Sequence, residues 1–397
     1  MVLRFIKLKW LLLCISVTFV MTGCWNNRDI AEMSFAVAIG IDKAENDQIE
    51  ITVQIAKPSA MKLAGSGEGG TGGKEAAWVY SAKGDTVFDA IRNSYTSVKG
   101  RLFINHIQLI VIGEELAKES IVDNFDFFER ESEFNIKALV LIAKGLTAKE
   151  VLNAHTELGN LPVTHIKDVI KNSHVNTTKI KKTILFDVIQ EMVRVGIEPI
   201  IPVIYSDKEK KESLIVKDLK IEGSGIIKDG RLTGWLNDKE TRGALYVLNE
   251  VKNTIISISN PNEDKKKISL EVLQSKGQAN FEKRNGSILF RISIRQKVNI
   301  GEIQGEIDLT KKDTIKKIEE NANQYVENEI REAIEKMQVD YQADVLGFGE
   351  IINKKAPGLW KELEGSWDKV FSKIPVEIEV ETITTRSGYT QNPPKPK

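Results

Sequence analysis

The sequence predicts an α+β protein of several domains, in which helices flank mixed sheets. Three observations support this prediction. The first part of the chain alternates short apolar segments with segments of helical spacing. The last third has several strand-like segments and then one long amphipathic stretch, which indicates an antiparallel-rich sheet beside a single long helix. With 397 residues, the chain is long enough for two or three domains.

The first residues have the composition of an export signal. Residues 1–9 contain basic side chains and no acid, and residues 10–20 are mostly apolar. This apolar run is too short for a spanning helix, which needs about 20 residues. Two small residues then precede Cys24, whose thiol can take a lipid. We expect residues 1–23 to be removed as a lipoprotein signal peptide and Cys24 to be acylated; an incidental cysteine in a plain secreted protein is the alternative.

Composition limits the partners of the exported chain. The full chain has 56 basic and 56 acidic side chains, so removal of the basic signal leaves a slightly acidic protein. Binding to nucleic acid or to anionic lipid by charge favours a basic face, so neither is expected. Cys14 and Cys24 are the only cysteines, so the mature protein has no disulfide. Residues 24–29 reach at most about 20 Å, which places the first domain against the lipid head groups.

Residues 24–145 are predicted to form an N-terminal α+β domain. Residues 34–41 and 48–56 alternate apolar with polar or small side chains, which indicates a hairpin. The glycine-rich run at 65–73 is expected to be a loop, because no helix opens where a dinucleotide-binding motif needs one. Further predicted elements are a strand at 78–80, a helix at 85–98, a strand at 106–112, a helix at 114–130 and a strand at 136–143.

Residues 146–250 are predicted to form a middle domain. Its clearest helix covers residues 184–195, and Gly196 follows as a C-cap. An apolar strand is expected at 200–205. Residues 219–235 are expected to form a hairpin, because Asp229 and Gly230 are typical turn residues between two strand-like segments.

Residues 251–386 are predicted to form a C-terminal α+β domain. Apolar positions change phase around Gly301, which indicates a β-bulge. The long amphipathic helix is expected at 313–346; a coiled-coil seam is the alternative, but flanking strands favour a helix packed on its own sheet. The expected strands are 254–259, 268–274, 288–298, 302–309 and 376–381, a short helix holds residues 359–367, and 387–397 is a disordered tail.

A search for catalytic, cofactor and metal motifs identifies no candidate. Ser366 and Lys369 have the S-x-x-K spacing, but a solvated lysine beside packed tryptophans explains them, and the chain has no K-T-G sequence. The four histidines fit no common zinc spacing, and His106 is interpreted as a structural residue. The sequence therefore predicts no catalytic residue, no cofactor and no metal ion.

Four stretches, taken in order behind the lipidation sequence, resemble one known family. They are Gly23–Trp25; Gly100–His106 with Val111–Ala117; Gly225–Leu236 with Glu240–Gly243; and Asp344–Gly349 with Pro357–Trp360 and Trp367. Together they are similar to the Ger(x)C lipoproteins, the C subunits of spore nutrient germinant receptors.

This resemblance implies a function. It implies a three-domain lipoprotein on the outer face of the spore inner membrane, held there by diacylglyceryl-Cys24. It implies integral membrane A and B subunits as partners and a non-catalytic role as scaffold or signal relay in nutrient-triggered germination. Two other classes remain as alternatives: a solute-binding lipoprotein of an importer, which needs two similar lobes around a cleft, and a cell-envelope hydrolase.

Cys24 is the main predicted functional residue, as the lipid-attachment site. Five residues of the family-like stretches are weaker candidates for contacts with partners. They are Trp235, Arg242, Phe348, Trp360 and Trp367. For the last three, a place in the hydrophobic core is the preferred alternative.

Overall fold

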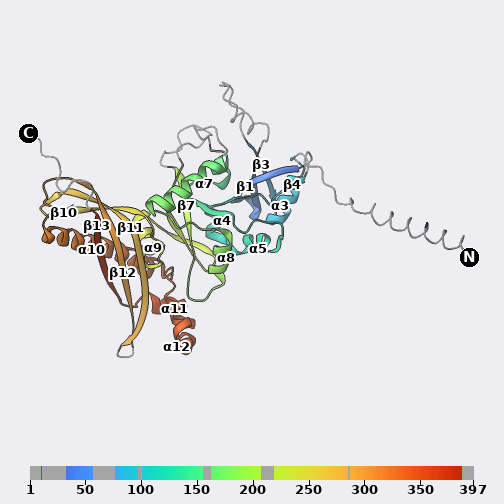
Figure 1. Cartoon of the computed structure of the whole chain (residues 1–397). Helices are drawn as coiled ribbons and strands as arrows, with labels where there is room; N and C mark the ends of the chain where they lie inside the picture. The colour runs from blue at the N-terminus through green and yellow to red at the C-terminus, as the bar shows by residue number, and fades with distance from the viewer. Residues whose placement is uncertain are drawn as a thin grey trace, which may run out of the picture.

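A computed structural model describes residue 10 and residues 33–56, 77–96, 98, 101–154, 162–206, 219–284 and 287–386. Apart from residue 10, the predicted signal peptide lies outside the described residues, as do Cys24 and its tether, the glycine-rich run, His155 and the predicted tail. The described residues form two mixed sheets with flanking helices (Figure 1), which confirms the predicted α+β class.

The larger sheet has nine strands in the order β3-β2-β1-β5-β6-β7-β8-β9, with β4 beside β1. Its centre is parallel, and an antiparallel hairpin flanks it on each side. The strands are β1 (Met33–Lys43), β2 (Ile49–Ala56), β3 (Ala77–Gly84), β4 (Arg101–Phe103), β5 (Leu109–Gly113), β6 (Leu139–Ala143), β7 (Ile200–Ser206), β8 (Leu219–Lys228) and β9 (Arg231–Leu236).

Helices cover both faces of this sheet, so its central strands are buried on both sides. Every residue of β5 and of β6 is buried, which explains their unbroken apolar sequences. One face packs against α3 (Val87–Ser94), α4 (Glu114–Glu119), α5 (Val122–Arg130) and α8 (Leu185–Val193). The other face packs against α6 (Ala148–Leu152) and α7 (Pro162–Asn172), which continues into the π-helical turn η4 (Ser173–Thr177).

The smaller sheet has the order β10-β11-β12-β13. It comprises β10 (Thr254–Asn260), β11 (Glu263–Arg284), β12 (Ser287–Ile303) and β13 (Val376–Arg386), and β13 runs parallel to β12. The amphipathic helix α10 (Lys312–Glu335) packs on its inner face through Ile318, Val326 and Ile330. After the π-helical turn η5 (Lys336–Tyr341) come α11 (Phe348–Lys355), α12 (Pro357–Leu363), η6 (Glu364–Ser366) and α13 (Trp367–Phe371).

Two predicted turns are confirmed. The pairing of β11 with β12 skips Gly301, so the expected bulge is present. Asp229 and Gly230 connect β8 to β9 with φ of 50° and 72°, as a tight hairpin turn requires.

Three predicted elements need correction, and two further elements were not predicted. Residues 114–130 form two helices rather than one, because the extended backbone of Ser120 interrupts them. The strand expected at 302–309 is wrong: β12 ends at Ile303, and Gly305 turns the chain with φ of 84°. The long helix ends at residue 335, and η5 then leads to Gln342, which is left-handed. The short strand β4 and the helix α11 were not expected from the sequence.

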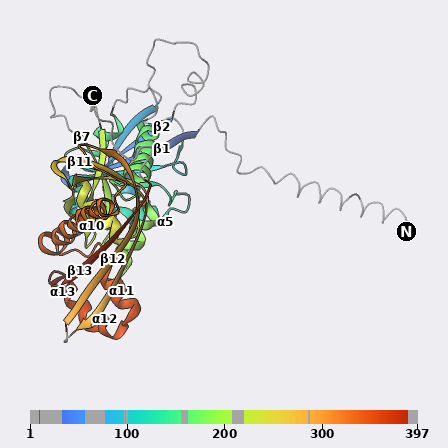
Figure 2. The ribbon, with the colours of Figure 1, turned by 60° about the vertical axis from the view of Figure 1, so that its left-hand side comes forward.

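The two sheets share one hydrophobic core. Helix α9 (Asp238–Val247) follows β9, and its residues Ala244–Val247 lie in the core that also contains Ile200, Ile226 and Leu236 of the nine-stranded sheet. Figure 2 shows α11, α12 and α13 beside the long β11–β12 hairpin. Strands of the predicted N-terminal and middle domains pair within one sheet, and the boundaries near residues 145 and 250 stay predictions.

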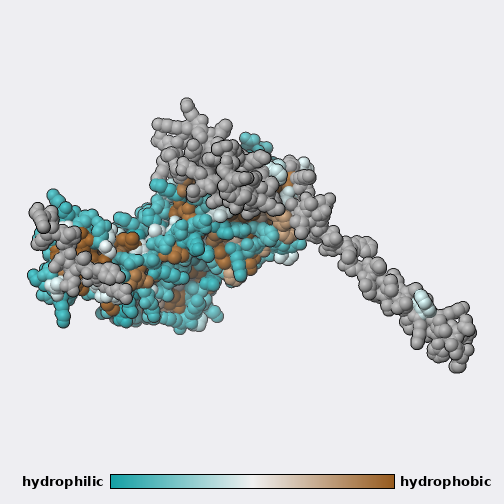
Figure 3. All heavy atoms as spheres, turned by 45° about the horizontal axis from the view of Figure 1, so that its top comes forward, coloured by the Kyte–Doolittle hydropathy of each residue, from teal (hydrophilic) through white to brown (hydrophobic). Residues whose placement is uncertain are grey.

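The search for membrane-spanning segments in the described part of the chain finds no helix that is long and apolar enough. The face seen in Figure 3 is mostly hydrophilic over both sheets, with small separate apolar areas.

Candidate functional site at the junction of the two sheets

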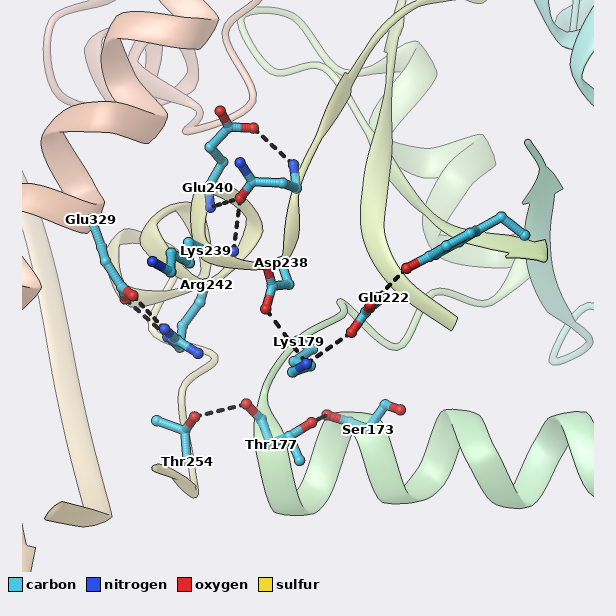
Figure 4. Close-up of polar contacts among 12 residues, drawn as sticks. Ser173, Thr177, Lys179, Glu222, Asp238, Lys239, Glu240, Arg242, Thr254 and Glu329 are labelled. Carbon is cyan, nitrogen blue, oxygen red and sulfur yellow. Dashed lines mark hydrogen bonds and ion pairs between the residues drawn. The ribbon is translucent and has the colours of Figure 1, made fainter. Parts of the chain in front are cut away.

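Helix α9 begins with a capping box. The side chain of Asn237 accepts hydrogen bonds from the backbone N–H groups of Lys239 and Glu240, each at 2.9 Å. Glu240 in return accepts a 2.8 Å hydrogen bond from the Asn237 N–H (Figure 4). This start directs α9 from the edge of the nine-stranded sheet towards α10.

A buried ion pair joins α9 to α10. The Arg242 guanidinium donates to both carboxylate oxygens of Glu329, with Nε at 2.9 Å from Oε2, and neither residue is more than 6% exposed. Burial opposes the charge of Arg242, but its hydrogen bonds with Glu329 outweigh this cost and raise the pKa of the guanidinium. Gly243 permits the close approach, since a Cβ there would overlap the Glu329 carbonyl group. The ion pair therefore holds α9 and α10 in one arrangement, because either charge would be buried and unpaired without the other.

A second buried carboxylate lies where the C-terminal helices meet the nine-stranded sheet. Asp344 accepts hydrogen bonds from the N–H groups of Phe348 at 3.0 Å and Gly349 at 2.8 Å, and from the Trp367 indole at 3.1 Å. Burial raises the pKa of Asp344 to about 7, although these hydrogen bonds act in the opposite direction. The backbone of Asp344 accepts a further hydrogen bond, at 2.9 Å, from the N–H of Glu198.

The segment from Gly196 to Glu198 contacts this turn closely. A Cβ at Gly196 would lie 2.5 Å from the backbone of Gly349, and the Glu350 N–H donates to the Gly196 carbonyl at 3.0 Å. Burial and the nearby carboxylates of Asp229 and Asp368 raise the pKa of Glu198 to about 8, so this side chain is protonated at neutral pH.

A cavity of about 630 Å³ opens at the same junction. Its wall on the nine-stranded sheet contains Trp235, and the Lys144 ammonium lies 4.9 Å from the centre of that ring. Tyr341 of η5 also lines the cavity and places its hydroxyl 3.3 Å from both the backbone nitrogen and the carbonyl oxygen of Trp235. The Tyr341 ring covers Gly234, where a Cβ would overlap it.

The cavity also has a polar wall. Glu222 of β8 accepts hydrogen bonds from the Tyr205 hydroxyl at 2.6 Å and from Lys179 at 2.8 Å, and Lys179 lies 3.5 Å from Asp238 (Figure 4). The hydrogen bond from Lys179 is the largest cause of the lowered pKa of Glu222, which therefore stays ionised. A further hydrogen bond, at 2.7 Å from the Thr254 hydroxyl to the Thr177 carbonyl, connects η4 to the smaller sheet.

The five described candidate residues lie on or near this junction, but most are internal. Trp235 is half-buried in the cavity wall, and Arg242 is in the buried ion pair. Phe348, Trp360 and Trp367 are in the core, as the preferred alternative expected. Phe348 stacks on Phe290 with centroids 3.9 Å apart, and Trp360 packs edge-on against Trp367 at 5.2 Å. The proposed interface role of these residues stays a prediction.

Sequence reasoning did not identify Glu329 or the polar wall of the cavity. Glu329 had a signal, because it lies on the same helical stripe as Ala322, Val326 and Ala333, where an acid needs a buried partner. Lys179 follows η4, Glu222 is in β8 and Asp238 begins α9, so their meeting depends on tertiary contacts that the sequence does not show.

The sequence matches two family descriptions in tandem. Residues 26–205 match the spore germination protein N-terminal domain, and residues 222–388 match the spore germination B3/GerAC-like C-terminal domain. Two similar Bacillus subtilis proteins are spore germination protein KC, with 27% identity over 95% of each chain, and spore germination protein A3, with 26% identity over 96% of this chain and 98% of the relative. The crystal structure of the GerBC protein matches the fold over 90% of this chain and 99% of that chain, with a TM-score of 0.57 and 20% identity.

Proposed function

The chain belongs to the family of GerAC-like spore germination proteins, and we propose that it is the lipid-anchored C subunit of a nutrient germinant receptor. Its proposed partners are the two integral membrane subunits of such a receptor, A and B. Its proposed role is non-catalytic: it stabilises the receptor outside the bilayer and passes on a conformational change that the nutrient causes.

The observation that carries this proposal is the extent of the likeness. The match to spore germination protein KC covers 95% of both chains, and the two family matches together include both sheets. The likeness therefore concerns the whole body of the protein and not one module that could serve many functions. The two sheets also differ in size and topology, unlike the similar lobes of the importer alternative.

The sequence around Cys24 supports the proposed position at the outer face of the spore inner membrane. A sequence with the composition of an export signal precedes this cysteine, and only eight residues separate it from Met33, where β1 begins. Such a tether reaches about 30 Å at most, so the nine-stranded sheet would stay close to the head groups. Two acyl chains would make this attachment stable without any charge attraction.

The junction supports the proposed relay of a signal. The Arg242–Glu329 pair and the Asp344 turn connect the nine-stranded sheet to the C-terminal helices through buried groups. Such contacts cannot stretch gradually, because each unpaired group would be costly. A force on one sheet would therefore move the other as a unit.

A substitution at the anchor tests the proposal. Spores that carry Cys24→Ala should contain less of the protein in their inner membrane and should germinate poorly with nutrients. Cys14→Ala is the matched control, since it removes the other cysteine of the chain and leaves the lipidation position intact. Germination is followed by loss of optical density, and receptor abundance by immunoblot. Normal germination and normal receptor abundance in Cys24→Ala spores would contradict the anchored role.

A further inference from the structure

The cavity at the junction has the size and position of a ligand site. Its volume of about 630 Å³ lies within the range of small-molecule pockets, and it opens between two structural units, where such sites often occur. The proposed scaffold role assigns it no purpose.

The lining combines aromatic rings with carboxylates. The rings belong to Tyr205, Trp235 and Tyr341, which come from β7, β9 and η5. The carboxylates belong to Glu222, Asp238 and Glu240. Aromatic faces and carboxylates both attract cations, and aromatic-lined pockets are a recurrent way to bind organic ammonium groups.

The protein's own lysines show which chemistry this lining accepts. The Lys144 ammonium lies over the Trp235 ring, and the Lys336 ammonium lies 5.6 Å from the centre of the Tyr341 ring. Lys179 lies between Glu222 and Asp238. Two ammonium groups of the cavity lining, those of Lys144 and Lys336, thus occupy positions that an ammonium ligand could take, and the Lys179 ammonium pairs with two of the lining carboxylates.

The contact between Lys144 and Trp235 is the one that a ligand could replace most easily. Lys144 is exposed, so its ammonium can return to water when another cation takes its place on the ring. Lys179 is held by two carboxylates and Lys336 also pairs with Asp340 at 2.6 Å. A ligand that displaced either lysine would have to break these ion pairs.

We propose that this cavity binds a small organic ammonium compound, whose cationic group replaces the Lys144 ammonium on the Trp235 ring. Glu222, Asp238 and Glu240 supply the surrounding negative potential. The ligand would contact β9 through Trp235 and the turn η5 through Tyr341. Binding would therefore stabilise the contact between β9 and η5, and this effect does not depend on the lipid anchor.

Titration calorimetry of the full-length, detergent-purified protein tests the proposal. The probes are choline and its uncharged isostere, in which carbon replaces the quaternary nitrogen. We expect saturable binding of choline and at least tenfold weaker binding of the isostere. Trp235→Leu should weaken choline binding about tenfold, whereas Trp235→Phe, which keeps an aromatic face, should retain most of it; circular dichroism checks that both variants fold.

Lys144→Met gives the sharpest result, because it should strengthen binding. Removal of the competing ammonium leaves the ring free, so the affinity for choline should rise about threefold or more. Lys43→Met is the matched control: this lysine pairs with Glu119 away from the cavity, and its loss should leave the affinity unchanged. Equal binding of choline and its isostere, no saturable binding, or an affinity that Lys144→Met lowers or leaves unchanged would each overturn the proposal.

Discussion

Arginine–glutamate pairs occur both at the junction of the two sheets and on the open face of the smaller sheet, in opposite surroundings. At the junction, Arg242 and Glu329 are 6% and 4% exposed. On the open face, the side chains of Arg295 and Glu381 are 70% and 53% exposed, although their closest atoms are only 2.6 Å apart. The contact distance alone therefore says little about what an ion pair contributes to the stability of the fold.

The difference lies in what each charge loses when its partner is removed. A junction charge would remain away from water without compensation, whereas an open-face charge returns to solvent. The buried pair thus fixes one arrangement of the two sheets. The pairs of β12 and β13 have another effect, since their charges line an edge strand and discourage pairing with other chains.

The largest expected effect follows from removing one member of the buried pair. Glu329→Ala leaves the Arg242 guanidinium buried and unpaired, so the free energy of unfolding should fall by about 3–5 kcal/mol. Urea denaturation of the full chain measures it. Glu327→Ala on the same helix is the control: Glu327 pairs with exposed Arg331, and its loss should cost only about 0.3–0.5 kcal/mol. Similar losses of stability in both variants would contradict the difference between the buried pair and the exposed pair.

A second test concerns the close contact between backbones at the junction. Gly349→Ala places a Cβ 2.7 Å from both the Gly196 Cα and the Trp360 ring, so α11 must shift away from its neighbours and stability should fall by about 1–3 kcal/mol. Gly358→Ala is the control, because no atom lies within 4 Å of its Cβ. In helix α12 this change should stabilise the protein by about 0.4–1 kcal/mol. Thermal unfolding of both variants should therefore shift in opposite directions.

The protonated Glu198 gives the junction a pH dependence. Its pKa is about 8 in the folded protein against an ordinary value of 4.5, so the folded state binds the extra proton between these values. This contribution to stability is complete below about pH 4.5 and is lost as pH rises to about 8. Asp229, Asp368 and Asp344 repel the ionised form, and only Lys228 opposes them.

Glu198→Gln removes this dependence. At pH 8 the variant should be more stable than the natural protein by at least the ~1.4 kcal/mol that one pKa unit is worth, and the difference should be small at about pH 5. Melting temperatures of both proteins across this range provide the measurement. A constant difference at all pH values would show that Glu198 does not ionise in this way.

The smallest effect is expected on the open face. Arg295→Ala removes the exposed pair with Glu381 and should lower stability by no more than about 1 kcal/mol. Salt should reduce this loss further, because the Debye length falls to roughly 3 Å at about 1 M salt and the interaction between exposed charges is then weakened. Denaturation with and without salt checks the expectation, and a loss that persists in salt would indicate a packing role for the arginine stem.

Elements with a clear hydrophobic period could be predicted from the sequence. The smaller sheet has one open face, so its strands alternate visibly, and the bulge at Gly301 appeared as a change of phase. The Asp229–Gly230 turn was predictable because aspartate and glycine tolerate the positive φ that both positions adopt. The family-like stretches also indicated the regions that build the junction.

The rest depends on tertiary contacts that local pattern does not record. The apolar period of the long helix continues past residue 335, but η5 and Gln342 bend the chain so that Tyr341 reaches Trp235. The cavity forms from β7, β8, β9, α9 and η5, and Glu222 was not recognisable from the sequence as a neighbour of Asp238 and Glu240. Buried polar pairs such as Arg242 with Glu329 are similarly invisible until their partners are known.

The parallel pairing of β12 with β13 has a consequence for biosynthesis. Phe290 pairs with Val376, so the strand that completes the smaller sheet is made only after α10–α13 have been synthesised. During synthesis, β12 must therefore wait with an open edge until residues 376–386 have been made, a delay that long-range pairing imposes on folding. A premature stop codon between residues 304 and 375 would leave that edge permanently available for aggregation, so such truncated chains should be degraded rather than assembled.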